Sequence, residues 1–421
     1  MTSTLTRARV RIPVVVVGFV LVLVDGFDSA TISVVVPRLA ADWGVAPSAF
    51  TYPIAATNAG VALGYVAAGW VCVRLGERRA LQGGLLLAMV GSALSALVLP
   101  TESMTLLTAA RILTGLGIGV VLPTAIGITT SLNPARHKQR IAVVVTLGLA
   151  SGIAVGGAVG RPVLRGWGAD GMYWIAAVAT LLSMVLAAAV LGRAPARTEE
   201  AAVEEAPSAE VRALLAPVYR TTTLLLWTFS FLVFITSYML TSWIPTILVS
   251  YGFSVSDAPI GLTFLSVGGV LGGLTLIALT LRLGIARAMV VVAVVGLVFL
   301  VLLGTLEASG RPLLLLVLGA GLGVVACQIG QLTMAVSVYS AALRTTGVGL
   351  AAAVGRVGSV VGPAIGGVLI GAHLAPTTVM LLAAVPVLVA LGCACLLAFS
   401  GVRPGTGRAA LLPDAGRDGA Q

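Results

Sequence analysis

Twelve apolar segments, each about 18 to 25 residues long, make up most of this 421-residue chain. As an α-helix, each is long enough to cross about 30 Å of hydrocarbon. Charged residues are only 10% of the chain and hydrophobic residues are 58%, a composition that a soluble core could not bury. We therefore expect an all-α polytopic membrane protein with twelve transmembrane helices. The segments run approximately over residues 13–36, 51–73, 80–99, 106–131, 141–163, 172–192, 221–244, 259–281, 288–306, 313–338, 347–370 and 377–399.

The basic residues predict how these helices are oriented. Most of them fall in the loops on one side of the expected membrane, and only Arg38, Arg165 and Arg311 fall in the loops on the other. Positively charged loops stay in the cytoplasm, so we expect both termini to be cytoplasmic. The net charge of +10 then reflects topology, and a nucleic-acid partner is not expected.

The chain repeats itself. RLGERRA at 74–80 recurs 208 residues later as RLGIARA at 282–288, and a GxxxGxxxG stripe at 152–160 recurs at 358–366. A polar stretch rich in acidic residues and proline, at 193–220, separates the two copies. Six plus six helices in pseudo-symmetric halves is the architecture of the major facilitator superfamily, with the substrate site near the midplane. The expected parts are an N-terminal half (1–192), a cytoplasmic linker (193–220), a C-terminal half (221–400) and a cytoplasmic tail (401–421).

Two acids lie deep in the first apolar segment, in VLVDGFDSATISVV at 22–35. Asp25 and Asp28 are three positions apart, so we expect both on one helical face that points into a central cavity. A charged carboxylate at mid-membrane costs about 3 kcal/mol or more. Burial and mutual repulsion favour protonation, so we expect at least one of them to carry a proton. The alternative is that both acids pair with arginines to join helices, or face water without coupling.

Three arginines fall inside the apolar segments. Arg356 lies among small residues and is the best candidate to bind a substrate carboxylate, since guanidinium holds carboxylate with two hydrogen bonds. Arg111 is expected either to bind substrate or to form a gate or salt bridge. Arg161, near a helix end, is expected to reach the membrane interface.

Uncharged polar residues complete the expected binding site, with helix packing as the alternative role. The aromatic run WTFSFLVFITSYM at 227–239 is expected to face lipid, with Tyr238 as the exception. The candidates are Tyr52, Asn58, Tyr238, Trp243, Gln328, Gln331 and Tyr339, of which Asn58, Tyr238, Gln328 and Gln331 are expected to bind substrate.

Two stretches carry a specific resemblance to a known family. VDGFDSATISVVVPRLAADWG at 24–44 and LRTTGVGLAAAVGRVGSVVGPAIGG at 343–367 resemble helices 1 and 11 of the aromatic acid:proton symporter group of the major facilitator superfamily. RILTGLGIGVVLPTAIG at 111–127 and SYMLTSWIPTILVSYGFS at 237–254 resemble the superfamily more generally. The resemblance covers nearly the whole chain. It implies gating roles for Arg74, Arg78 and Arg344.

One departure from the family concerns the loop between helices 2 and 3. Val73 stands where the family has an aspartate that helps hold the outward-open state, and Leu281 stands at the equivalent position of the second half. The usual cytoplasmic gate is therefore not expected to form in the usual way.

Together these features predict a transporter, not an enzyme. We expect a proton symporter in the bacterial inner membrane that imports a small, aromatic carboxylate, works as a monomer and needs no cofactor or metal beyond the coupling proton. The alternative is an exporter of drugs or metabolites driven by proton antiport. Exporters tend to carry GxxxGPxxGG in helix 5, whereas here that string stands in helix 11, at 358–367, which favours import.

Overall fold

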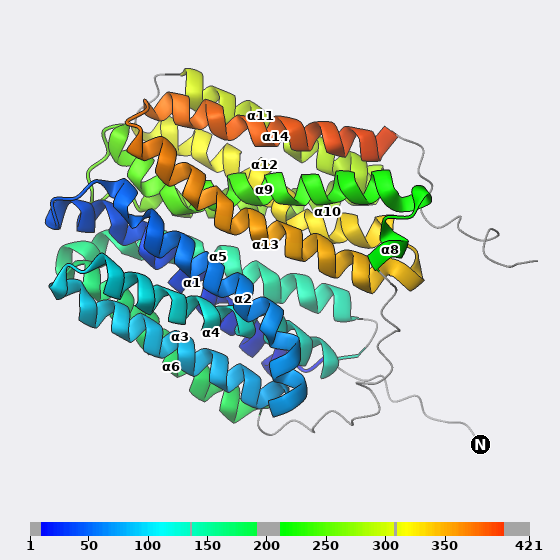
Figure 1. Ribbon diagram of the computed structural model, residues 1–421, viewed down its shortest axis with the longest axis horizontal. Helices are drawn as coiled ribbons and strands as arrows, with labels where there is room; N and C mark the ends of the chain where they lie inside the picture. Colours follow the sequence, from blue (N-terminus) through cyan, green and yellow to red (C-terminus); the bar gives the residue numbers. More distant parts are fainter. Residues whose placement is uncertain (1–9, 135–136, 192–210, 307–309, 400–421) are drawn as a thin grey trace, which may run out of the picture.

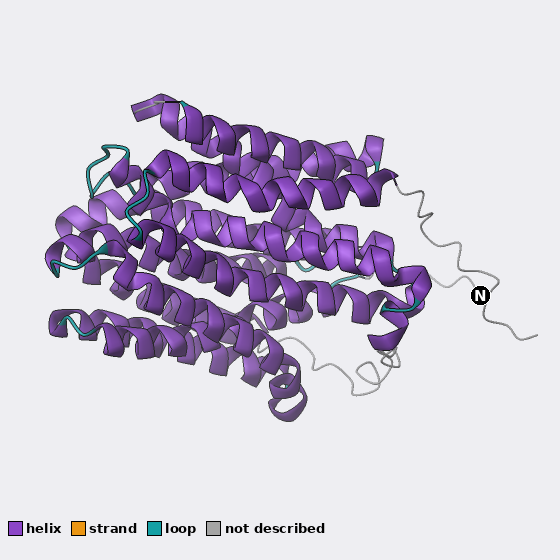
Figure 2. Cartoon of the chain, turned by 45° about the horizontal axis from the view of Figure 1, so that its top comes forward, coloured by secondary structure: helices purple, strands orange, loops and turns teal. Residues whose placement is uncertain are grey.

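The fold is all-helical over the residues described by the computed structural model, which are 10–134, 137–191, 211–306 and 310–399 (Figures 1 and 2). The helices are α1 (Ile12–Asp42), η1 (Pro47–Phe50), α2 (Thr51–Leu75), α3 (Glu77–Val98), η2 (Leu99–Thr101), α4 (Met104–Ser131), α5 (Lys138–Gly166), α6 (Gly168–Leu191), α8 (Val211–Leu214), α9 (Pro217–Ser250), α10 (Ile260–Leu283), α11 (Ile285–Thr305), α12 (Gly310–Val338), α13 (Ala341–Gly371) and α14 (Pro376–Phe399).

The prediction of twelve spans is confirmed. Within the described residues, twelve helices are long and apolar enough to cross a membrane. Some bounds differ from the expected ones: α1 continues to Asp42, because Pro37 does not break it, and α9 begins at Pro217, where proline is favoured in the first turn. Residues 193–210 of the expected linker and the whole expected tail, 401–421, lie outside the described residues.

The helices form two six-helix halves that lie side by side, α1–α6 and α9–α14 (Figure 1). The repeat seen in the sequence is visible in the backbone. Gly76 joins α2 to α3 at φ +80°, and Gly284 joins α10 to α11 at φ +78°. These glycines stand 208 residues apart and adopt a conformation that side chains disfavour, so the same tight junction is built twice.

Helix packing repeats in the same way. A Cβ added to Gly152 of α5 would collide with the backbone of α1 at Leu23, and one added to Gly362 of α13 would collide with the backbone of α9 at Ile235. The glycine stripes therefore let α5 approach α1 and α13 approach α9, as small residues do in membrane helices.

The two ends of the molecule differ in how the halves meet. We name them after η1, which lies in the turn between α1 and α2, and α8, which precedes α9. At the α8 end each half has its own apolar cluster, one including Leu21 and Leu85 and the other including Phe229 and Met289. Toward the η1 end a single cluster contains residues of both halves, among them Phe50 and the fully buried Trp243. The halves thus share one core at the η1 end.

Two polar contacts between the halves lie at this same end. Arg161 of α5 forms an ion pair with Asp257, in the turn before α10, with 2.8 Å between Nε and Oδ1. Thr263 of α10 donates a hydrogen bond of 2.9 Å to the carbonyl of Ala154 in α5. The structure is therefore a conformation closed at the η1 end.

A cysteine pair across the closed end tests this arrangement. A Cβ on Gly371 of α13 would lie 3.1 Å from Cβ of Ser48 in η1, within a few tenths of an ångström of disulfide geometry. We expect the Ser48→Cys/Gly371→Cys variant to form a disulfide under mild oxidation, measured as loss of labelling by a maleimide–polyethylene glycol reagent.

Each single-cysteine variant provides the control, since it should stay labelled after oxidation. A double variant that remains fully labelled in the membrane would show that the halves are not joined at this end.

Candidate functional site

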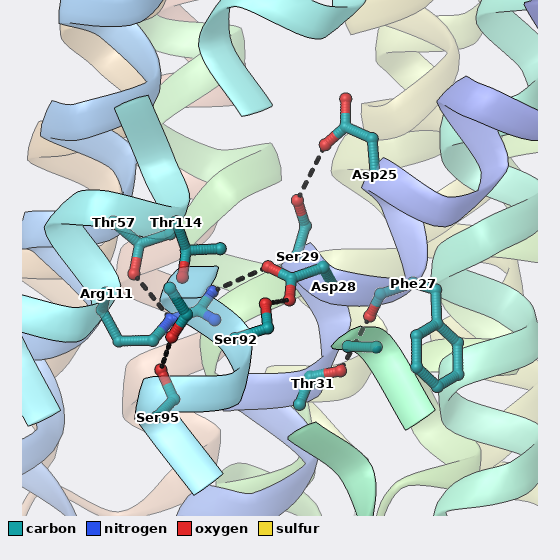
Figure 3. A network of polar contacts seen from close by, with 12 residues as sticks. Asp25, Phe27, Asp28, Ser29, Thr31, Thr57, Ser92, Ser95, Arg111 and Thr114 are labelled. Carbon is teal, nitrogen blue, oxygen red and sulfur yellow. Dashed lines mark hydrogen bonds and ion pairs between the residues drawn. The ribbon is translucent and has the colours of Figure 1, made fainter. Parts of the chain in front are cut away.

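An ion pair buried inside the N-terminal half dominates the polar interior. Arg111 of α4 and Asp28 of α1 are 3.2 Å apart between Nη2 and Oδ2, and their side chains are 0% and 3% exposed. Ser92 of α3 donates a hydrogen bond of 2.5 Å to the other carboxylate oxygen of Asp28. The Asp28 carboxylate therefore has partners on both oxygens (Figure 3).

Arg111 is held by further contacts. Its Nε donates to the hydroxyl of Thr57 in α2 over 3.2 Å, and its guanidinium lies 5.6 Å from the ring centroid of Tyr173 in α6. Among the described residues, Nη1 of Arg111 and the hydroxyl of Tyr173 are buried without a hydrogen-bond partner. Of the roles expected for Arg111, the structure shows the salt bridge. Together with Ser92, Thr57 and Tyr173 it connects five helices of one half.

Asp25 lies outside this network. In Figure 3 the Asp28 carboxylate meets Arg111 and Ser92, whereas the Asp25 carboxylate meets Ser29. Residues three apart on an α-helix still differ by about 60° in direction, which is enough to give them different neighbours. Asp25 is 6% exposed, and Ser29 donates a long hydrogen bond of 3.5 Å to its carboxylate. The charged side chains that act on its carboxylate are Asp28 and, from the other half, Arg356.

Arg356 lies halfway along α13 and contacts both halves. Its Nη1 donates a hydrogen bond of 3.0 Å to the hydroxyl of Tyr238 in α9. Its guanidinium carbon lies 5.0 Å from the ring centroid of Tyr65, which belongs to α2 of the N-terminal half. A guanidinium over an aromatic face is attracted by the ring, so Tyr65 fixes Arg356 from across the interface. The structure thus brings Arg356 and Tyr238 of the predicted site into contact, with Asp25 within electrostatic reach of Arg356.

Two residues of this group were not among the sequence candidates. No sequence pattern pointed to Tyr65. Its contact with Arg356 joins segments almost 300 residues apart, which only the folded structure brings together. Phe234 belongs to the aromatic run expected to face lipid, and that expectation is wrong for Phe229 and Phe234, which are 0% and 8% exposed. Phe234 stacks on Tyr238 with 5.8 Å between ring centroids and so helps to position its hydroxyl.

The predicted amides have different surroundings. Gln328 of α12 accepts a short hydrogen bond from Ser237 of α9, and Gln331 donates one of 2.8 Å to Ser230. Both bonds join helices of the C-terminal half, and Gln331 is completely buried. These contacts agree with the alternative role in helix packing. Asn58 of α2 is half-buried, and its side chain donates back to the carbonyl of Ile54 over 2.9 Å.

The predicted gating residues lie at the α8 end. Arg74, at the last turn of α2, is exposed and stacks 4.4 Å from the ring centroid of Trp70. Arg78 is half-buried in the first turn of α3, and Arg344 is exposed near the start of α13. Val73 and Leu281, at the positions where the family pattern calls for acids, are 87% and 85% exposed.

Sequence comparison identifies the family. The model of the Major Facilitator Superfamily matches residues 18–334. The chain belongs to the Major Facilitator Superfamily. Solved structures share its fold: a D-xylose-proton symporter aligns with a TM-score of 0.72 at 16% identity, over 94% of this chain and 98% of that one.

Curated relatives of this Major Facilitator Superfamily chain are transporters. A 4-hydroxybenzoate transporter, PcaK, from Pseudomonas aeruginosa is 28% identical over 85% of this chain and 86% of its own length. A 3-(3-hydroxy-phenyl)propionate transporter from Escherichia coli is 29% identical over 88% of this chain and 90% of its own length. The chain is thus a transporter by fold and by relatives, and not an enzyme. Among the described residues, no group of three or more His, Cys, Asp or Glu side chains could hold a metal ion.

The buried pair makes a prediction for stability. Removing one partner leaves the other charge uncompensated in the protein interior, which costs about 3–5 kcal/mol. We expect Asp28→Asn and Arg111→Gln each to lower thermal stability strongly in detergent. The double variant Asp28→Asn/Arg111→Gln should lose clearly less than the sum of the two, with a coupling of about 1–3 kcal/mol.

The exposed pair of Arg38 and Asp42 on the same helix, 2.8 Å apart, is the matched control. Its double-mutant cycle should give a coupling below about 1 kcal/mol. Strictly additive losses at Asp28 and Arg111 would contradict the ion pair.

Proposed function

We propose that this transporter is a proton symporter that imports small aromatic carboxylates across the bacterial inner membrane as a monomer, with the η1 end facing outward. One observation carries the proposal: Asp28 is paired with Arg111 and Ser92 inside its own half, whereas Asp25 has no ion-pair partner among the described residues and lies within electrostatic reach of Arg356 of the other half. Asp25 is therefore the carboxylate whose charge matters when the halves move, and we assign the coupling proton to it.

Coupling follows from competition for Arg356. When Asp25 is ionised, its negative charge balances the guanidinium. When Asp25 takes up a proton from outside, Arg356 needs another anion, and a substrate carboxylate supplies it with two charge-assisted hydrogen bonds. A buried charge without a counterion is costly, so Arg356 without either partner is disfavoured, and substrate and proton cross together.

This exchange fixes the stoichiometry that we propose. One proton neutralises one Asp25, and one monocarboxylate replaces it at Arg356. The net charge moved is zero, so uptake of a monocarboxylate should respond to a pH gradient and not to membrane potential.

The preference for aromatic acids rests on two kinds of support. The relatives that cover most of this chain are named for transport of 4-hydroxybenzoate and 3-(3-hydroxy-phenyl)propionate, both aromatic acids. Beside Arg356, the rings of Tyr65 and Tyr238 offer aromatic surface on which a substrate ring can pack.

The first functional prediction concerns Asp25. In proteoliposomes with an imposed pH gradient, Asp25→Asn should accumulate labelled 4-hydroxybenzoate about tenfold less than the wild type, because no proton can be taken up at position 25. Exchange of labelled for unlabelled substrate at equal pH should persist, since it requires no net proton movement.

Asp42→Asn removes a carboxylate at the exposed end of the same helix and should leave uptake unchanged. An Asp25→Asn protein that still accumulates substrate like the wild type would refute the assignment of the proton to Asp25. Gradient-driven expulsion of substrate from the vesicles, in place of uptake, would support the exporter alternative.

The second functional prediction concerns Tyr65. Loss of a cation–π contact worth about 1 kcal/mol should raise the KM of Tyr65→Leu about fivefold, while kcat changes little. Tyr65→Phe keeps the ring face and should stay within about twofold of the wild type. Equal KM values for the leucine and phenylalanine variants would contradict a role for the ring.

A further inference from the structure

An ion-pair group at the η1 end lies far from Asp25 and Arg356 along the helices. Arg161 and Arg165 are one turn apart on α5, and both approach Asp257 of the other half, at 2.8 Å and 3.7 Å from Oδ1. Arg165 also donates a hydrogen bond of 3.2 Å to the hydroxyl of Ser256. Sequence reasoning expected Arg161 to reach the membrane interface, whereas the structure places it against the other half.

Among the described residues, this group carries more positive than negative charge. Two guanidinium groups share one carboxylate, and both arginine side chains remain accessible, with 57% and 53% of their surface exposed. Ser254 already donates a hydrogen bond of 2.7 Å to Oδ2 of Asp257. An excess positive charge at an accessible position attracts anions.

The contact between Arg161 and Asp257 is also imperfect. Oδ1 of Asp257 is buried, yet among the described residues it accepts no hydrogen bond of good geometry, although Nε of Arg161 is close. Guanidinium binds a carboxylate best through two parallel N–H donors. A freely moving carboxylate could adopt that arrangement, which Asp257 does not.

A pocket of about 520 Å³ opens beside these charges. Arg161 and Asp257 line it together with apolar surface from Pro162, Tyr251 and Phe253. The Tyr251 ring is fixed, because its hydroxyl donates a hydrogen bond of 2.6 Å to the carbonyl of Leu303. A few charged groups on a mostly apolar wall, in this range of volume, are typical of small-molecule sites.

We propose that this pocket is a second, outer binding site for a small aromatic carboxylate, whose carboxylate takes the place of Asp257 at Arg161 while its ring packs against Tyr251 and Phe253. Only the ligand class rests on the proposed function; the site itself rests on the geometry at the η1 end.

Binding there has a conformational consequence. Arg161 and Arg165 belong to the N-terminal half and Asp257 to the C-terminal half, so an anion that takes the arginines removes an ion pair between the halves. The ligand thereby weakens the closed η1 end before it reaches Arg356.

The Arg356→Gln substitution removes the arginine of the central site. Calorimetric measurement of benzoate binding to this variant in detergent therefore tests the outer site alone. We expect binding to persist, to weaken about tenfold or more in Arg356→Gln/Arg161→Gln, and to tighten about threefold or more in Arg356→Gln/Asp257→Asn, where the competing carboxylate is gone. Benzamide, which has the same ring without the charge, should not bind.

Arg356→Gln/Arg38→Gln is the matched control, because Arg38 is an exposed, carboxylate-paired arginine at the same end, and it should bind benzoate unchanged. If the Arg356→Gln protein does not fold, the wild type should show two benzoate sites and Arg161→Gln one. Loss of all binding in folded Arg356→Gln, or weaker binding in the Asp257→Asn variant, would overturn the proposal.

A second readout follows the closed end directly. In the Ser48→Cys/Gly371→Cys protein carrying Arg356→Gln, benzoate should slow disulfide formation at least about threefold, and it should have no such effect once Arg161→Gln is added. Benzoate that leaves the rate unchanged in the first protein would refute the link to closure. Transport by Arg356→Gln at the wild-type rate would refute the proposed role of Arg356 and leave the outer site standing.

Discussion

The ion pair between Asp28 and Arg111 is the interaction on which the rest of the arrangement depends. Each of the two buried charges needs the other as its counterion. Ser92, Thr57 and the ring of Tyr173 provide their further contacts. An interior pair of this kind adds little net stability, but breaking it is costly. It therefore holds α1 to α3 and α4 and leaves Asp25 as the acid at the boundary between the halves.

The two halves share the same helix arrangement but differ in the polar residues that they place at equivalent positions. In the C-terminal half, Thr236 occupies the position equivalent to Asp28, 208 residues later, and its hydroxyl lies 3.3 Å from the carbonyl of Ala383. A neutral hydrogen bond between α9 and α14 thus stands where the first half has a charge on α1. The duplicated architecture does not require the acids, which is consistent with a functional reason for keeping them.

Most of the fold could be predicted from the sequence, because hydrophobic length, glycine stripes and the 208-residue repeat are local or periodic signals. The presence of Asp25, Asp28, Arg111 and Arg356 in the interior could also be predicted, since charge inside an apolar segment is conspicuous. Their partners could not. A spacing of three leaves about 60° between Asp25 and Asp28, and which side meets which helix depends on packing of the whole bundle. In the sequence, Tyr65 looks like any aromatic residue of a membrane helix, and only the packing of α13 beside α2 shows its contact with Arg356.

The contact between Tyr65 and Arg356 has a consequence for how the substrate specificity of such a transporter can change. The acids lie on α1 of one half, while the Arg356 guanidinium and the hydroxyl of Tyr238 lie on the other, so in the proposed mechanism the proton-binding group and the substrate-binding arginine belong to separate halves. Chimaeras that keep the first half and exchange the second could inherit a new specificity together with the old driving force. Because Tyr65 reaches across the boundary, position 65 is the place where such a hybrid would have to be matched to its new partner.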